Sequence, residues 1–488
     1  MSSTLTVALL QLRAFDLAEH EQAWTELLRR IDDAAAETPR LIVAPEAAYP
    51  AGILGSREAY AALPLRGDAE VLATLGDRAR RHACYIAAGL VLRDSFGQPQ
   101  NAAVLIAPGG AVIARATEAH AAPWFATGSG PVSALVDDVR IALFAGSDAT
   151  DAARVGALVE EGARVLVSTA AATTWGRSLD RLPESPTHLL LAARAMESGA
   201  WAVTPAKVGI ESGTRVYSGR AGVVSPTGAW IARAPSDRPG IALHEIDLDL
   251  ASGPPVTSLR GAAIAPPADL RHLAAVAITP TPSAVDLMEA LRAVVRSSAA
   301  QGVRLLVLPD LAGAETRAVT SAESLPLIEA LSGETHTMLA VALAERGDGG
   351  TYKTMYLIDR GTTIASHRQS TLSLLERDAG FTPGSTPPPV VTTPLGRLGL
   401  LCGVEGLVPT LAAGLAERGA TVIAWCASDL RLPIEALARA RAIETARTVV
   451  VAGVAAPLGG GSIIDARGTV LATTVEGHAM AARAEIRG

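Results

Sequence analysis

The chain has 488 residues, of which 49% are hydrophobic and 19% are charged, and its formal net charge is −7. This length suits two or three packed domains, and this composition excludes an intrinsically disordered chain. Acidic and basic residues are mixed along the sequence, so nucleic-acid binding is not expected.

The N-terminal segment MSSTLTVALLQLRAFDLAEH lacks a basic region ahead of its apolar residues, so it predicts a first strand rather than a signal peptide. Purely apolar runs stay below about 18 residues, so no membrane span is predicted. Three scattered cysteines, Cys84, Cys402 and Cys426, are too few for a disulfide framework or a zinc cluster. We therefore expect a cytoplasmic protein, and no cofactor is indicated.

A helix is predicted over residues 19–36. The next segment, RLIVAPEAAYP, has a buried β-type run that ends at Pro-Glu, with the acid at Glu46. Residues 101–120 have a hairpin pattern around a Gly-containing turn and end with Glu118 and His120.

The apolar run RIALFAGSD then reads as a strand that ends in Gly146-Ser-Asp148. A helix is predicted over residues 149–161. Farther along, the segment Arg194–Glu197 ends a helix before a β-rich run, and its Arg and Glu predict a buried charge pair.

The second half repeats these blocks in the same order. RLLVLPDLAG carries Asp310, a second hairpin pattern covers residues 352–371, and RLGLLCGVE ends in Gly403-Val-Glu405. Helices are predicted over residues 285–299 and 407–418, and the Arg-Ala-x-Glu and Gly-rich blocks recur near the C-terminus. The sequence therefore predicts a tandem duplication.

A Pro- and Ala-rich stretch, residues 251–273, separates the two series. We place the boundary near residue 268, which gives domains of residues 1–267 and 268–488. Strands alternate with helices in each half, so both are predicted to be α/β, with sheets covered by helices.

In series and duplicated, these blocks resemble the nitrilase, or carbon–nitrogen hydrolase, superfamily, over nearly the whole chain. The resemblance implies two tandem αββα sandwich domains. Family members pair through one face, so it also implies an αββα–αββα pseudo-dimer within one chain. Family chemistry uses a Glu as general base, a Lys that stabilises the oxyanion and a Cys nucleophile that attacks an amide or nitrile carbon.

In the first half, the resemblance places Glu46 at the base position and retains the family His as His120. The lysine position holds Glu118, and the cysteine position holds Gly146, two residues before Asp148. Both the cation and the thiol of the family mechanism are thus missing from this half.

In the second half, Asp310 stands at the base position, Gln369 at the lysine position and Gly403 at the cysteine position, two residues before Glu405. A further family acid near the pocket is matched here by Glu376. This half has also lost the catalytic Lys and Cys.

The chain has only two lysines, and neither stands at a family lysine position. Lys207 is a candidate binding residue, and Lys353 lies in the second hairpin. Cys402 precedes Gly403, one residue out of register, so its thiol is expected to point away from the pocket into the core. A bulge could re-aim it, so Cys402 also stays a candidate.

An acid cluster is an alternative. In family geometry, Glu46, Glu118 and Asp148 would converge with His120 nearby, and could ligate a divalent cation or share a proton. The second half offers Asp310, Glu376 and Glu405 in the same way.

Two functional hypotheses follow. The first is a non-hydrolytic pseudoenzyme that binds a small nitrogen-containing molecule or a partner protein. The second is an active C–N hydrolase that uses Cys402 with Asp310, or a carboxylate route through the acid cluster. The chain is expected to be a monomer with an internal pseudo-dimer, or a higher homo-oligomer, away from membranes.

Overall fold

A computed structural model of the chain describes residues 4–119, 121–122, 124–174, 185–253, 273–277, 284–313, 320–428, 432–453, 460–474 and 480–484. The chain divides into two compact units, Met1–Pro254 and Pro255–Gly488. The boundary expected near residue 268 lies outside the described residues.

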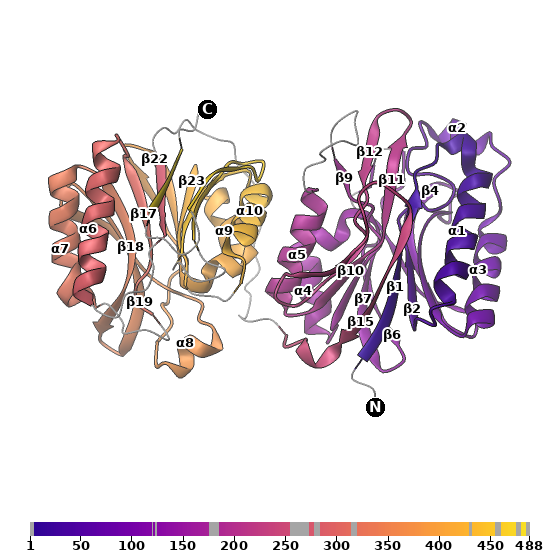
Figure 1. The fold of residues 1–488 in the computed structure, drawn as a ribbon, viewed down its shortest axis with the longest axis horizontal. Helices are drawn as coiled ribbons and strands as arrows, with labels where there is room; N and C mark the ends of the chain where they lie inside the picture. The colour runs from indigo at the N-terminus through magenta and orange to yellow at the C-terminus, as the bar shows by residue number, and fades with distance from the viewer. Residues whose placement is uncertain are drawn as a thin grey trace. The chain divides into compact units, whose positions relative to one another are not determined.

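Two sheets stack face to face in the first unit (Figure 1). The first sheet contains, in spatial order, β5 (Val112–Thr117), β4 (Pro99–Ile106), β3 (Tyr85–Arg93), β2 (Leu41–Ala44), β1 (Thr4–Arg13), β11 (Ala206–Glu211), β12 (Arg215–Ser218) and β9 (Thr173–Thr174), with β15 (Gly240–Asp247) also paired to β1. The second contains β14 (Trp230–Arg233), β13 (Gly222–Val224), β10 (Trp201–Thr204), β8 (Val165–Ser168), β7 (Val139–Phe144) and β6 (Val132–Val136).

Helices cover the outer face of each sheet. The first sheet is covered by α1 (His20–Ala35) and α3 (Asp68–His82), and the second by α4 (Ala152–Glu160) and α5 (Pro186–Ser198). The described short helices of this unit are η1 (Leu17–Glu19), α2 (Arg57–Ala61), η2 (Gly146–Thr150) and η3 (Leu248–Leu250). The helices expected over residues 19–36 and 149–161 are confirmed as α1 and α4.

The second unit repeats this arrangement. Its first sheet has the order β20 (Thr362–Arg368), β19 (Gly350–Asp359), β18 (Met338–Gly347), β17 (Leu305–Asp310), β16 (Leu273–Ala277) and β27 (Met480–Ala484). Its second has β21 (Val390–Thr393), β22 (Gly396–Cys402), β23 (Val422–Cys426), β24 (Thr448–Ala452), β25 (Gly461–Ile464) and β26 (Val470–Thr473). The described helices are α6 (Ala284–Ala300), α7 (Ser321–Thr335), α8 (Leu374–Asp378), η4 (Gly403–Leu407), α9 (Pro409–Glu417) and α10 (Ile434–Thr445).

Apolar side chains of alternating strand positions fill the space between the two sheets of each unit. In the first unit, Val7 and Leu9 of β1 belong to the same buried cluster as Ile141 and Leu143 of β7. Strands that are buried on both faces explain the long apolar runs in the sequence. Each unit is therefore an αββα sandwich, as the resemblance predicts.

The predicted charge pairs of the two Arg-Ala-x-Glu motifs are also present. Arg194 contacts Glu197 at 2.7 Å, and Arg441 contacts Glu444 at 3.3 Å. Both arginines are fully buried. Burial explains the pairing, since an unpaired charge in the core is costly.

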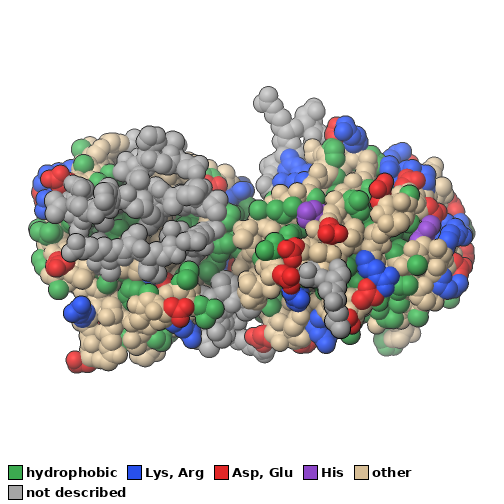
Figure 2. Space-filling model, turned by 60° about the horizontal axis from the view of Figure 1, so that its bottom comes forward, with side chains coloured by type: hydrophobic (Ala, Val, Ile, Leu, Met, Phe, Trp, Pro, Cys, Tyr) green, Lys and Arg blue, Asp and Glu red, His purple; other side chains and the backbone are tan. Residues whose placement is uncertain are grey.

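The helices in the described ranges include none that is both long and apolar enough to cross a membrane. Figure 2 shows acidic and basic side chains intermingled over the visible face of the first unit. Acidic and basic residues, which are mixed along the sequence, are therefore also intermingled on this surface.

Candidate active-site positions

The family positions gather where strands end. In the first unit Glu46 follows β2, Glu118 follows β5, and Gly146 opens η2 after β7. In the second unit Asp310 ends β17, Gln369 follows β20, and Gly403 opens η4 after β22. The two units thus present the same three positions at the same edge of their sheets, as the duplicated sequence predicts.

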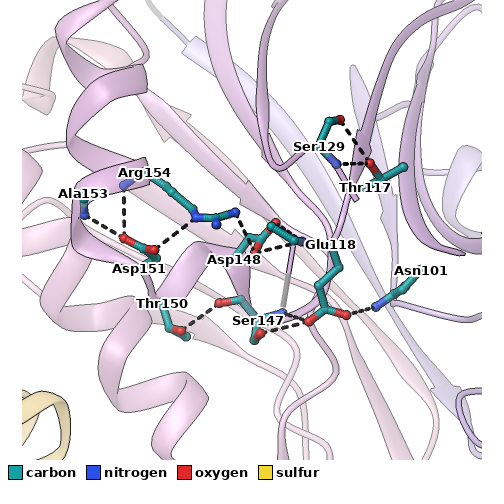
Figure 3. Close-up of polar contacts among 11 residues, drawn as sticks. Asn101, Thr117, Glu118, Ser129, Ser147, Asp148, Thr150, Asp151, Ala153 and Arg154 are labelled. Atoms are coloured by element: carbon teal, nitrogen blue, oxygen red, sulfur yellow. Dashed lines mark hydrogen bonds and ion pairs between the residues drawn. The ribbon is translucent and has the colours of Figure 1, made fainter. Parts of the chain in front are cut away.

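In the first unit, Glu118 occupies the space beside Gly146, the residue that the resemblance places at the cysteine position. The backbone at Gly146 has a φ of +51°, and a Cβ atom there would overlap the carboxyl group of Glu118. That carboxylate accepts hydrogen bonds from the backbone N–H and the hydroxyl of Ser147, at 2.8 and 2.9 Å (Figure 3). Glycine at position 146 is therefore what admits the buried Glu118 side chain.

The second unit repeats this substitution with an amide. Gly403 has a φ of +56°, and a Cβ atom there would overlap the side-chain oxygen of Gln369. The Gln369 amide donates hydrogen bonds to the Thr371 carbonyl at 2.7 Å and to Glu376 at 3.0 Å. In both units a long side chain, from the residue that the resemblance assigns to the lysine position, fills the space beside the glycine that it assigns to the cysteine position.

Glu46 is linked to this arrangement through Asn101 of β4. The Asn101 amide donates to Glu118 at 2.8 Å and to Glu46 at 3.2 Å. Burial, and then the negative charge of Glu118, raises the pKa of Glu46 to about 6. Glu46 is half-buried, whereas its counterpart Asp310 is buried, so the first unit keeps the more accessible acid.

Asp148 does not join this acid group. Its carboxylate accepts a hydrogen bond from the backbone N–H of Ala119 at 3.1 Å. It also forms an ion pair with the Arg154 guanidinium group at 3.2 Å (Figure 3). Within the described ranges, no group of three His, Cys, Asp or Glu could hold a metal ion. The expected convergence of Glu46, Glu118 and Asp148 is thus wrong for Asp148, because its carboxylate holds a loop, and His120 lies outside the described residues.

Glu405 holds the matching loop in the second unit. Its carboxylate accepts the backbone N–H groups of Ser370 and Cys402, at 2.7 and 2.9 Å, and contacts His367 at 3.0 Å. These partners lie in β20, in the segment after it and at the end of β22, directly before η4. Its neighbours give Glu405 a positioning role in the fold.

A second group of polar residues lies beside Glu46, on the β11–β12 hairpin. The ammonium group of Lys207 donates to the Ala47 carbonyl at 2.8 Å and lies 3.9 Å from Glu211. Burial lowers the pKa of Lys207. Glu211 accepts the Tyr217 hydroxyl at 2.7 Å within the hairpin and the backbone N–H of Ile53 at 2.6 Å. The bonds to Ala47 and Ile53 tie the hairpin to the loop that carries Glu46.

Lys353 is a site residue that the sequence analysis missed. Its ammonium group contacts Asp310 at 2.6 Å, Glu376 at 2.9 Å and the Ser428 hydroxyl at 3.2 Å. Burial lowers the pKa of Lys353, but the two carboxylates outweigh burial and raise it above its usual value. The signal was present in the hairpins, since NAAVLI and KTMYLI align Lys353 with Asn101.

Cys402 points into the sandwich core. It is fully buried among Leu398, Leu400 and Cys426. Burial raises the pKa of its thiol well above the usual value. This is the position that the one-residue offset favours, and the charge of Asp310 is the next cause, after burial, of the raised pKa of the thiol.

The comparisons with known proteins agree with this architecture. The model of the carbon-nitrogen hydrolase family matches residues 6–253 and again residues 272–486. The deaminated glutathione amidase of Mus musculus is 29% identical over 246 residues, which cover 43% of this chain and 76% of the mouse protein. The Rattus norvegicus enzyme of the same name is 31% identical over 140 residues, which cover 25% of this chain and 43% of the rat protein.

Solved structures of one amidase also match. A variant of the amidase from Nesterenkonia sp. AN1, in complex with butyramide, is 21% identical, with a TM-score of 0.44 over 51% of this chain and 92% of the amidase. Another variant of that amidase, with acrylamide added at its active-site cysteine, has a TM-score of 0.43 and 20% identity, over 51% of this chain and 95% of the amidase. The two matches of the family model together span most of the sequence. The chain therefore belongs to the carbon–nitrogen hydrolase family and carries two tandem domains of it.

Proposed function

We propose that this chain is a non-hydrolytic member of its family that binds a small nitrogen-containing molecule beside Glu46. The observation that carries the proposal is the filling of both nucleophile positions. Glu118 and Gln369 lie where the cysteine side chain of an active family member would stand. Neither group is a nucleophile that can form the family's covalent intermediate.

The buried thiols give no substitute nucleophile. Cys402 and Cys426 are fully buried, and burial raises the pKa of both thiols well above the usual value. Cysteine reacts as the thiolate, so these thiols are poor nucleophiles at neutral pH. Few cysteines, all free, also suit a reducing cytoplasmic setting, which is part of this proposal.

The first unit is the better candidate for ligand binding. Its acid, Glu46, is half-buried and close to the charges of Lys207 and Arg215. In the second unit Asp310 is enclosed by Lys353 and Ser428. An acid with a pKa of about 6 donates a hydrogen bond when protonated and accepts one when ionised, which suits the C=O and N–H groups of an amide. The curated relatives are named as amidases, which supports a small amide as the ligand.

The test is ammonia release by the full chain, measured over a panel of small amides, nitriles and ureas. Wild type, Glu46→Gln and Cys402→Ala are assayed together, and binding of the same panel is followed by thermal shift. We expect no release from any of the three proteins, and stabilisation by one or more amides that Glu46→Gln weakens. Release that disappears in one variant alone would overturn the proposal and identify the reacting half.

A rebuilt site is the positive control. The double variant Gly146→Cys with Glu118→Lys restores the family residue types in the first unit, and Gly403→Cys with Gln369→Lys does so in the second. Labelling of the new thiol by iodoacetamide, with Cys84, Cys402 and Cys426 unlabelled in the folded wild type, would show that the accessible nucleophile is what the chain lacks. Rapid labelling of Cys402 in the wild type would instead support a thiol enzyme.

A further inference from the structure

A charged pocket lies in the second unit at the opposite end of the strands from Asp310. Its volume is about 570 Å³, which is within the range of roughly 300–1,000 Å³ typical of small-ligand sites. Four ionisable side chains line it: Arg304 ahead of β17, His336 ahead of β18, and Asp359 and Arg360 at the β19–β20 turn. None of these residues takes part in the family chemistry.

The duplication supplies an internal comparison for Arg304. Arg40 stands ahead of β2 in the first unit as Arg304 stands ahead of β17 in the second. The Arg40 guanidinium pairs with both carboxylate oxygens of Asp137, which lies in the β6–β7 turn. It also donates to the Ala83 carbonyl at 2.9 Å and stacks on the Tyr85 ring, 4.9 Å from its centroid.

The second unit has lost these partners. Pro394 stands in the β21–β22 turn where the first unit has Asp137, and Met338 opens β18 as Tyr85 opens β3. Both Pro394 and Met338 line the pocket. Within the described part of the chain, Arg304 and Arg360 make no ion pair, and both are exposed arginines that line the pocket where the first unit has a carboxylate.

We propose that this pocket binds a small oxyanion, a carboxylate or a phosphate, between Arg304 and Arg360. The bound oxyanion takes the place that the Asp137 carboxylate has in the first unit. The planar guanidinium group matches two oxygens of a carboxylate or phosphate at once. Asp359 accepts a hydrogen bond from an N–H or O–H group of the same ligand.

The surrounding helices set a condition on this binding. Both α6 and α7 end at the pocket, where Ala299 and Thr335 line it, and the carbonyl ends of helices disfavour anions. Attraction by the pocket as a whole is therefore weak, and direct contacts with the two guanidinium groups must supply the affinity. Removing either arginine should thus have a large effect.

The experiment is a calorimetric titration of the full chain with inorganic phosphate and, separately, with succinate. We expect saturable binding of at least one anion, at least tenfold weaker in Arg304→Ala and in Arg360→Ala, and lost in the double variant. The control is Arg377→Ala, which removes the same charge from an exposed arginine outside the pocket and should leave binding unchanged. The anion that saturates at the lower concentration distinguishes phosphate from carboxylate.

A further variant adds a carboxylate instead of removing an arginine, so that loss of anion binding can be separated from loss of folding. Pro394→Asp returns a carboxylate to the turn, so Arg304 gains the pairing that Arg40 has, and anion binding should disappear while the protein stays folded. Absence of saturable binding in the folded wild type, or binding that survives loss of both arginines, would overturn the proposal. Neither result bears on the role proposed for Glu46, which lies in the other unit.

Discussion

At the scale of single residues, Gly146 and Glu118 form one coupled pair. Glu118 fits only because residue 146 has no side chain, and its carboxylate in turn holds Ser147. We predict that Gly146→Ala alone costs about 1–3 kcal/mol of unfolding free energy, through overlap with Glu118 and the positive φ of this residue. Glu118→Ala alone should cost about 1–3 kcal/mol, because it removes the buried hydrogen bond from the Asn101 amide and both hydrogen bonds from Ser147.

The double variant tests the coupling. Gly146→Ala with Glu118→Ala should cost less than the sum of the single changes, by about 0.5–3 kcal/mol in urea unfolding, since the overlap is gone. Gly403→Ala with Gln369→Ala is the matched cycle in the second unit and should behave alike. Additive costs in both cycles would show that the two positions are independent.

Glu46 predicts a pH dependence of stability. Its pKa rises from 4.5 to about 6 in the folded chain, so the folded state binds this proton more tightly than the unfolded state does. The contribution of Glu46 to stability is therefore greatest below pH 4.5 and declines as the pH rises to about 6, by about 1–2 kcal/mol in all. Unfolding free energies of wild type and Glu46→Gln should differ by a pH-dependent amount over this window. A constant difference would contradict the raised pKa.

At the scale of elements, a buried charge network ties the second unit together. Lys353 of β19 contacts Asp310 of β17 and Glu376 of α8, and Ser428 follows β23. Removing one partner of a buried ion pair leaves an uncompensated charge. We predict that Lys353→Met lowers the unfolding free energy by about 3–5 kcal/mol, measured by urea denaturation of the full chain.

Asn101→Ala is the matched control, because Asn101 has the equivalent place in the first unit. This variant removes the hydrogen bonds of a neutral amide rather than a buried charge, so the expected loss of unfolding free energy is smaller, about 1–3 kcal/mol. A loss for Lys353→Met no larger than that for Asn101→Ala would show that the buried charges of the second unit contribute little.

Some of these elements could be predicted from the sequence, and others could not. Helices such as α1 and α9 follow from apolar spacing, and Gly146 and Gly403 follow from the repeat. Lys353 was missed because a strand residue inside a hairpin belongs to no motif. Only the alignment of the two hairpins, which places Lys353 opposite Asn101, shows that Lys353 belongs to the site. Asp148 was misjudged because a carboxylate that accepts a backbone N–H looks, in sequence, like one that faces a ligand.

At the scale of the whole molecule, the two units have the same fold and different polar centres. The first keeps a half-buried Glu46 beside the charged β11–β12 hairpin, whereas the second encloses Asp310 in an ion-pair network. The pocket lined by Arg304 and Arg360 has its counterpart in the exposed Arg40–Asp137 ion pair. The two units therefore differ in the accessibility of their acids and in the partners of the arginine ahead of β2 and β17.

The family resemblance also predicts that the two halves pair face to face within one chain. A pairing surface that buries apolar area should hold the halves together without the covalent connection. We therefore predict that residues 1–253 and 272–488, coexpressed as separate chains with a tag on one, copurify in equal amounts, and that the intact chain has the mass of one copy by light scattering. Separate elution of two folded halves would contradict the pairing, and a mass of two or more chains would show that the pairing surface is used between copies instead.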